Sequence, residues 1–172
     1  MASMLRLVAL LFACALWVNS AGGESNRPLV GHIMALLAVF EEADVLPPET
    51  APEANELIHA LIQTQAALTK STNPATRRWF AEALRRSEAP GAELDAREGL
   101  TSRALEAIAA YADTHSPAAR PDVMAGLQEF NVSAADLDLM ARVYHQARDR
   151  FRSEGRNIHR LYEAHRHAMP LR

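Results

Sequence analysis

Cysteine is nearly absent from this chain of 172 residues, which contains one, Cys14. A single thiol cannot form an intramolecular disulfide, a cysteine-ligated zinc site or the C-x-x-C-H attachment of haem. Cys14 also lies in a segment that we expect to be either removed or lipidated, so the mature chain keeps no free thiol. Disulfide scaffolds and thiolate nucleophiles are therefore excluded.

Aromatic residues are also scarce, at 6% of the chain, while alanine and leucine recur throughout and 49% of the residues are hydrophobic. No segment of strand length alternates strictly between polar and apolar residues, and aromatic and β-branched residues are the ones that favour strands. We expect an all-α fold: a single-domain helical bundle of about five to seven helices with a long C-terminal helix.

The first residues have the order of a secretory signal peptide. Arg6 precedes an apolar run from Leu7 to Val18, and the small residues Ser20 and Ala21 follow it. A run of 12 residues is far shorter than the roughly 20 that a membrane-spanning helix needs. We expect residues 1–22 to be removed on export and residues 23–172 to form the helical domain, in the periplasm or outside the cell.

The stretch "LFAC" leaves a second interpretation of the N-terminus open. It resembles the lipobox of bacterial lipoproteins, in which the cysteine becomes a lipid-bearing N-terminus. Phe12 is bulky where a small residue is usual, and the apolar run continues beyond Cys14, where a polar tether would be expected. Membrane anchoring is therefore expected only if Cys14 is lipidated.

Signals for helix starts recur along the rest of the chain. Such signals are side chains that cap exposed N–H groups and prolines in the first turn. They occur at Asn26, at the capping box Thr50-Ala51-Pro52-Glu53, at Asn73-Pro74, at Asp95 to Glu98, at Pro117 and Pro121, and at Ser133 to Asp136. Apolar residues with a helical period follow each start, which predicts an array of short helices.

The last apolar pattern is the longest and runs from Leu137 to Met169. It keeps the helical period across Gly155, a residue that weakens a helix interior. One long helix and two helices broken at Gly155 both fit this pattern.

Charge is distributed unevenly along the chain. Residues 24–70 contain seven acidic and two basic residues, and residues 142–172 contain eight arginines and three acidic residues. An acidic start and a basic end either attract each other within a bundle or present a polarised surface to a partner.

The stretch "HRLYEAHRH", His159 to His167, is the strongest candidate for a metal site. His159, Glu163 and His167 share one stripe of a helix, but the two histidines lie about 12 Å apart along it, too far for one ion. Neighbouring arginines would also repel a cation. His165 instead joins the apolar stripe, where we expect a half-buried, hydrogen-bonded packing residue.

We therefore predict a non-enzymatic protein that binds or scaffolds a protein or another anionic macromolecule. The expected contact surface is the basic C-terminal helix, with Arg152, Arg156, His159, Arg160, Arg166 and His167 facing outward. Nucleic acid is not expected as a partner of an exported protein, no cofactor is expected, and no local catalytic motif is present. The alternative is a metal- or cofactor-binding protein that uses His159, Glu163 and His167 with acids from the N-terminal half.

Overall fold

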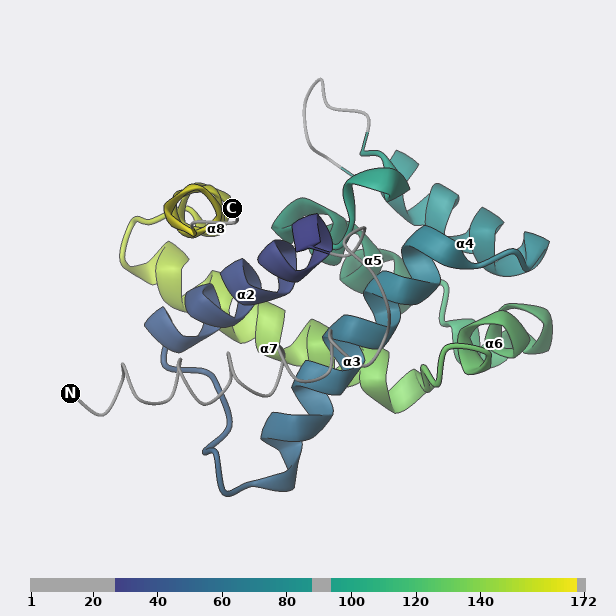
Figure 1. Cartoon of the computed structure of the whole chain (residues 1–172), viewed down its shortest axis with the longest axis horizontal. Coiled ribbons are helices and arrows are strands. Elements are labelled where there is room, and N and C mark those ends of the chain that lie inside the picture. The colour runs from purple at the N-terminus through teal and green to yellow at the C-terminus, as the bar shows by residue number, and fades with distance from the viewer. Residues whose placement is uncertain (1–26, 88–93, 170–172) are drawn as a thin grey trace.

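Seven α-helices and two short 3-10 turns make up the part of the chain that the computed structural model describes, residues 27–87 and 94–169. In chain order they are α2 (Arg27–Glu42), α3 (Pro52–Lys70), α4 (Pro74–Arg85), η2 (Ala96–Glu98), α5 (Ser102–Thr114), η3 (Pro117–Ala119), α6 (Pro121–Gln128), α7 (Ala134–Ser153) and α8 (Ile158–Ala168) (Figure 1). The expected all-α bundle is confirmed. The predicted signal peptide and Cys14 lie outside the described residues.

Two of the predicted helix starts are formed by the expected residues. The side chain of Asn73 accepts hydrogen bonds from the N–H groups of Ala75 and Thr76, and Pro74 occupies the first position of α4. Ser133 and Asp136 form a reciprocal capping box at the start of α7. Each device satisfies N–H groups that a helix start leaves without a partner.

At two other predicted starts the capping differs from the expectation, although α3 does begin within the predicted segment, at Pro52. The N-cap of α3 is Ala51, and no side chain caps it, so Thr50 and Glu53 do not form the expected box. Asp95 caps only the turn η2, because Gly99 takes a φ of 86° and ends the helical conformation there. Helix α5 begins after this interruption, with Thr101 as its cap.

The long C-terminal pattern forms two helices. Helix α7 ends at Ser153, and Gly155 adopts a φ of 69°, a conformation that glycine takes without the steric cost paid by other residues. Asn157 then caps α8 by accepting hydrogen bonds from the N–H groups of His159 and Arg160. Of the two interpretations that the sequence allowed, the one with two helices broken at Gly155 is therefore correct.

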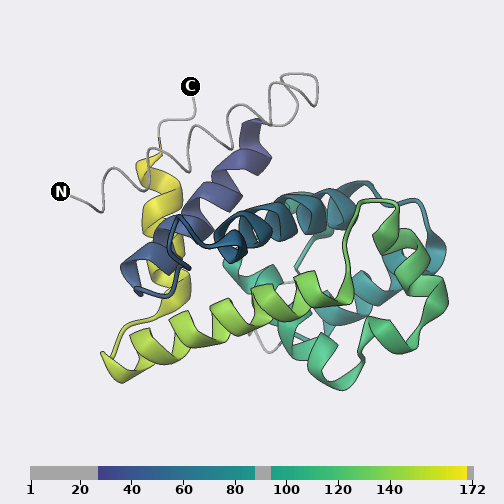
Figure 2. The ribbon, with the colours of Figure 1, turned by 90° about the horizontal axis from the view of Figure 1, so that it is seen from below.

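The core lies between α7 and the helices that pack around it. α7 runs along the bundle and buries large side chains such as Tyr144 and Phe151 against α3 and α5. α8 crosses the end of α7 and packs side by side with α2, while α4 and α6 pack together at the opposite end (Figure 2). No helix of residues 27–87 and 94–169 combines the length and the apolar character needed to cross a membrane.

Gly126 allows the close approach of α6 and α4. A Cβ atom at this position would lie 2.1 Å from Oγ1 of Thr76 and 2.6 Å from Cβ of Asn73. The hydroxyl of Thr76 donates a 2.9 Å hydrogen bond to the carbonyl oxygen of Val123, which fixes the two helices to each other. A larger side chain at position 126 would separate them.

Candidate functional site

Helix α8, which contains the histidine-rich stretch, is held to the bundle by a small apolar contact and by several polar contacts. Only two of its residues are buried, Ile158 and Tyr162. Nε2 of His165 lies 2.8 Å from Oε2 of Glu42 at the end of α2, and Arg156 forms an ion pair with the same carboxylate. His165 is therefore half-buried and hydrogen-bonded, as predicted, and the acidic and basic ends of the chain do attract each other here.

These two partners change the pKa of the Glu42 carboxylate. Burial opposes its ionisation, but the hydrogen bonds and charges of Arg156 and His165 outweigh burial and hold the pKa of Glu42 below its ordinary value. Glu42 is thus ionised at neutral pH and links α2 to the segment between α7 and α8 and to the last turn of α8.

A second contact between α2 and α8 joins His32 and Tyr162. Burial, with the charge of Arg166 as a smaller cause, lowers the pKa of His32 to about 4, and burial raises the pKa of Tyr162. His32 is therefore neutral at pH 7, and the Tyr162 hydroxyl donates a hydrogen bond to its Nδ1. The planes of the two rings are nearly parallel, at an interplanar angle of 11°, and their centroids are 6.3 Å apart, so the rings meet at their edges.

His159 does not lie on the outward stripe where we expected it. Its side chain is 13% exposed and contacts α5, with Nε2 2.9 Å from Oε2 of Glu106 and Nδ1 2.9 Å from Oγ of Ser102. The hydrogen bond from His159 lowers the pKa of Glu106, although burial opposes this effect. An ionised carboxylate can only accept, so Nε2 donates to it, and in the neutral imidazole Nδ1 accepts from the Ser102 hydroxyl.

The order Ser102, His159, Glu106 resembles the hydrogen-bonded order of a serine hydrolase triad. A nucleophile, however, must reach the carbonyl carbon of a substrate. Ser102 is 1% exposed in the first turn of α5, so its hydroxyl faces the core and no substrate can approach it. The arrangement fixes α8 to α5 and does not define an active site.

The predicted partner-binding residues divide into two groups. Arg152, Arg160 and His167 are exposed, and the side chain of His167 is 82% exposed. Arg156 is exposed but forms ion pairs with Glu42 and Glu154. Arg166 is half-buried beside His32, and His159 faces α5, so these two are not available as outward contacts.

The residues of the alternative metal site do not converge. Both ring nitrogens of His159 are occupied by Ser102 and Glu106, whereas His167 points to solvent, 3.8 Å from Glu163. Across residues 27–87 and 94–169, no three histidine, cysteine or acidic side chains are grouped so that they could hold one ion.

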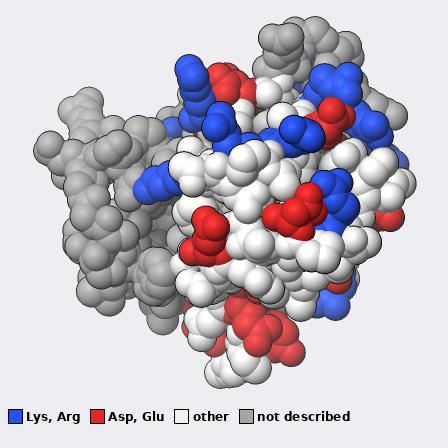
Figure 3. Space-filling model, turned by 90° about the vertical axis from the view of Figure 1, so that its right-hand side faces the viewer, with Lys and Arg blue, Asp and Glu red and all other residues white. Residues whose placement is uncertain are grey.

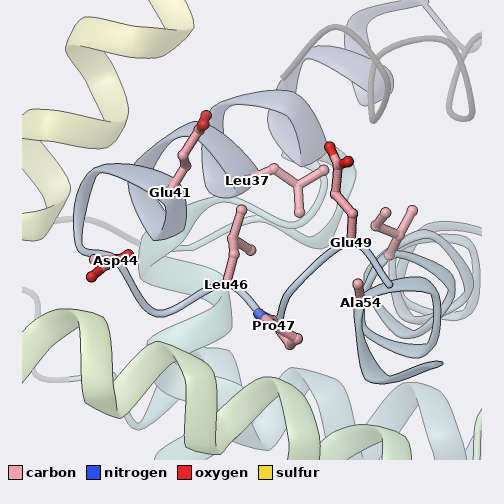
Figure 4. Close-up of a pocket in the computed structure, with 8 residues that line it drawn as sticks. Leu37, Glu41, Asp44, Leu46, Pro47, Glu49 and Ala54 are labelled. Carbon is pink, nitrogen blue, oxygen red and sulfur yellow. The ribbon is translucent and has the colours of Figure 1, made fainter. Parts of the chain in front are cut away.

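Acidic residues also surround a small apolar pocket between α2 and α3. The pocket has a volume of about 30 Å³ and is lined by Leu37 and Leu46, with Glu41, Asp44 and Glu49 at its edge. The three carboxylates are splayed around the pocket and do not point to a common centre (Figure 4). They form an acidic rim without the converging ligands that a cation needs.

A groove that the sequence did not predict lies between α4, α5 and α7. It has a volume of about 460 Å³, and its charged lining residues are Arg86, Arg103, Glu106 and Arg148. These residues come from three helices, so no local sequence motif indicates the groove. In the sequence, Arg86 belongs to a group of arginines near Trp79, with Arg77, Arg78 and Arg85, and this group is the signal nearest to the groove.

Comparison with known proteins adds no assignment: no protein family, curated protein or solved structure matches the chain significantly. The fold defines an all-α helical bundle, and its candidate sites rest on the geometry described above.

Proposed function

We propose that the protein is exported and acts as a non-enzymatic binding protein that docks an anionic macromolecular partner. The docking surface is the basic corner, defined as Arg152, Arg156 and Arg160 around the junction of α7 and α8, with His167 in the last turn of α8. The single observation that carries this proposal is that Arg152 and Arg160 are exposed and take part in no ion pair within the described chain. The signal-like N-terminal sequence supports export.

The charge around the corner is unbalanced. Residues 148–168 contain six arginines and three acidic residues. A surface of one sign speeds the encounter with a partner of opposite sign, and the attraction weakens as salt screens it. By contrast, acidic and basic side chains are interspersed on the face at the α4 and α6 end, with the largest acidic group at its lower edge (Figure 3).

The anchoring of α8 also supports a binding role. His165, His159 and Tyr162 each contact a residue of α2 or α5, which fixes the helix and therefore the side chains that it presents. A preorganised surface loses less conformational entropy on binding than a mobile one.

Arg156 plays a different part from the two unpaired arginines of the corner. It forms ion pairs with Glu42 and Glu154 and lies over the ring of Phe151, 5.0 Å from its centroid. Reversal of its charge would break one of the contacts that hold α8 and the preceding segment against α2. A test of binding should therefore change Arg152 and Arg160 and leave Arg156 intact.

The proposal is tested with a fluorescent peptide of ten glutamates as the anionic probe, titrated by fluorescence anisotropy. We expect binding that weakens as salt rises and that becomes at least tenfold weaker in the double variant Arg152→Glu/Arg160→Glu. The control Arg77→Glu/Arg78→Glu changes the same charge on exposed positions of α4 and should bind nearly as the wild type does. Equal losses in both variants, or no binding by the wild type, would contradict the proposal.

A further inference from the structure

The groove between α4, α5 and α7, which we call the arginine groove, has the size of a small-molecule site. Its volume of about 460 Å³ falls within the range of roughly 300 to 1,000 Å³ typical of ligand pockets. Arg86, Arg103 and Arg148 line it together with Tyr111, Thr114 and Glu106, and alanines of α4 and α5 add apolar surface. Ligand pockets commonly combine an apolar lining with a few polar groups.

Arg86 is held in place by aromatic neighbours. Its guanidinium carbon lies 5.4 Å from the centroid of the Tyr111 ring, and Nη1 lies 3.4 Å from Nε2 of His115. The His115 ring is itself stacked on Tyr111, with centroids 4.4 Å apart and an interplanar angle of 7°. These contacts orient the guanidinium without neutralising it.

The arginines of the groove differ in how far neighbouring acidic residues neutralise their charge. Glu82 lies 3.7 Å from Arg86, but its shorter contact, 2.7 Å, is with Arg85. Arg148 pairs with the adjacent Asp149 at 3.1 Å. Arg103 is exposed and forms no ion pair with any described residue, so its charge is the one most open to a ligand.

Glu106 limits the kind of ligand that the groove accepts. It lines the groove, and its hydrogen bond with His159 keeps it ionised. A ligand with negative charge along its whole length would be repelled there. A ligand with one anionic end and an uncharged body would place the anion near Arg103 and the body against Tyr111 and the alanines.

We propose that the arginine groove binds a small aromatic oxyanion, whose carboxylate or phosphate group contacts Arg103 and whose ring packs against Tyr111 and the alanines of the groove. Guanidinium groups match both kinds of oxyanion through paired N–H donors. The groove would take such a ligand independently of the basic corner.

The test titrates the purified protein with phenyl phosphate, benzoate, inorganic phosphate and the neutral benzyl alcohol, and follows the NMR resonances of Tyr111 and Ala107. We expect saturable shifts with phenyl phosphate or benzoate, whichever is the preferred oxyanion, and at least tenfold weaker binding in Arg103→Gln. Because Arg103 is exposed, this variant should fold normally. Arg142→Gln, an exposed arginine of α7 outside the groove, is the matched control and should keep the wild-type affinity.

Two results would overturn the proposal. If neither aromatic anion shifts the Tyr111 and Ala107 resonances, or if Arg142→Gln weakens binding as much as Arg103→Gln, the groove is not the site. If inorganic phosphate or benzyl alcohol binds as tightly as the aromatic anions, the groove does not select an aromatic oxyanion.

Discussion

His159 and Glu106 are joined by a 2.9 Å hydrogen bond across 53 residues of sequence, which connects α8 to α5. The contact places His159, a residue of the histidine-rich stretch, inside the molecule. There a hydrogen bond, in place of apolar packing, attaches α8 to α5. Helix α8 buries only Ile158 and Tyr162. Its position therefore depends more on polar contacts than the position of a helix with a continuous buried face does.

The first prediction concerns this pair. His159→Ala and Glu106→Ala should each lower the free energy of unfolding by about 1 to 2 kcal/mol, since each leaves a partly buried partner without its hydrogen bond. In a double-mutant cycle measured by urea denaturation, the coupling should be about 1 kcal/mol. The exposed pair His167 and Glu163 on the same helix, 3.8 Å apart, is the control and should couple by less than about 0.5 kcal/mol. Equal coupling in the two pairs would show that His159 does not anchor α8.

The second prediction concerns acid. The pKa of His32 is lowered from 6.5 to about 4 in the folded protein, so the unfolded chain binds a proton in this range and the folded protein does not. Stability should therefore fall as the pH is lowered from about 6.5 to 4, by about 2 kcal/mol after allowance for the partial exposure of the ring. Glu42 and Glu106, whose pKa values are lowered, add a further loss as the pH falls below their unfolded values.

Denaturation at several pH values measures this effect. His32→Phe should flatten the dependence between pH 6.5 and 4, whereas His167→Gln, a change at an exposed histidine, should keep it. A wild-type protein whose stability is constant over this interval would contradict the assignment of His32 as a partly buried, neutral histidine.

The third prediction concerns the contact of α6 with α4. Gly126→Ala should destabilise the protein by about 1 to 3 kcal/mol, because the new methyl group would meet Thr76 and Asn73 and the two helices would have to move apart. The neighbouring exposed residue offers a control, since Ala125→Ser should change stability by no more than about 0.5 kcal/mol. A neutral Gly126→Ala would mean that the two helices are not so closely packed.

The fourth prediction compares two helix starts that look alike in sequence. Ser133→Ala removes a formed capping box and should cost about 1 kcal/mol. Thr50→Ala removes an exposed side chain that does not cap α3 and should cost almost nothing. Thermal or urea unfolding distinguishes them, and a similar loss in both variants would favour the capping box at Thr50 that the sequence suggested.

Local features of the fold could be predicted from the sequence because they depend on neighbouring residues. The caps at Asn73 and Ser133 involve side chains and backbone only a few positions apart, whereas the break near Gly155 was one of two interpretations that the sequence left open. Thr50 does not cap α3, although its sequence pattern is equivalent to that at Ser133, because Ala51 occupies the N-cap position. Such shifts by one residue are common at helix ends.

The candidate sites could not be predicted in the same way. The partners of His159 are 53 and 57 residues away, so its helical stripe alone could not show that the side chain faces α5. The arginine groove combines residues of three helices, and Arg103 carries no local signal. Arg152 and Arg160, in contrast, were expected to be exposed from their place opposite the apolar stripe, and the structure places them so.

The most direct test of the proposed function is site-specific photo-crosslinking in the native host. A photo-reactive amino acid in place of Arg160 should yield a covalent adduct with an acidic macromolecule outside the cytoplasm, and high salt during irradiation should reduce the yield. The same amino acid in place of Arg77, at the opposite end of the bundle, should yield no such adduct. Adducts from position 77 alone, or from neither position, would contradict the account of the basic corner as the docking surface.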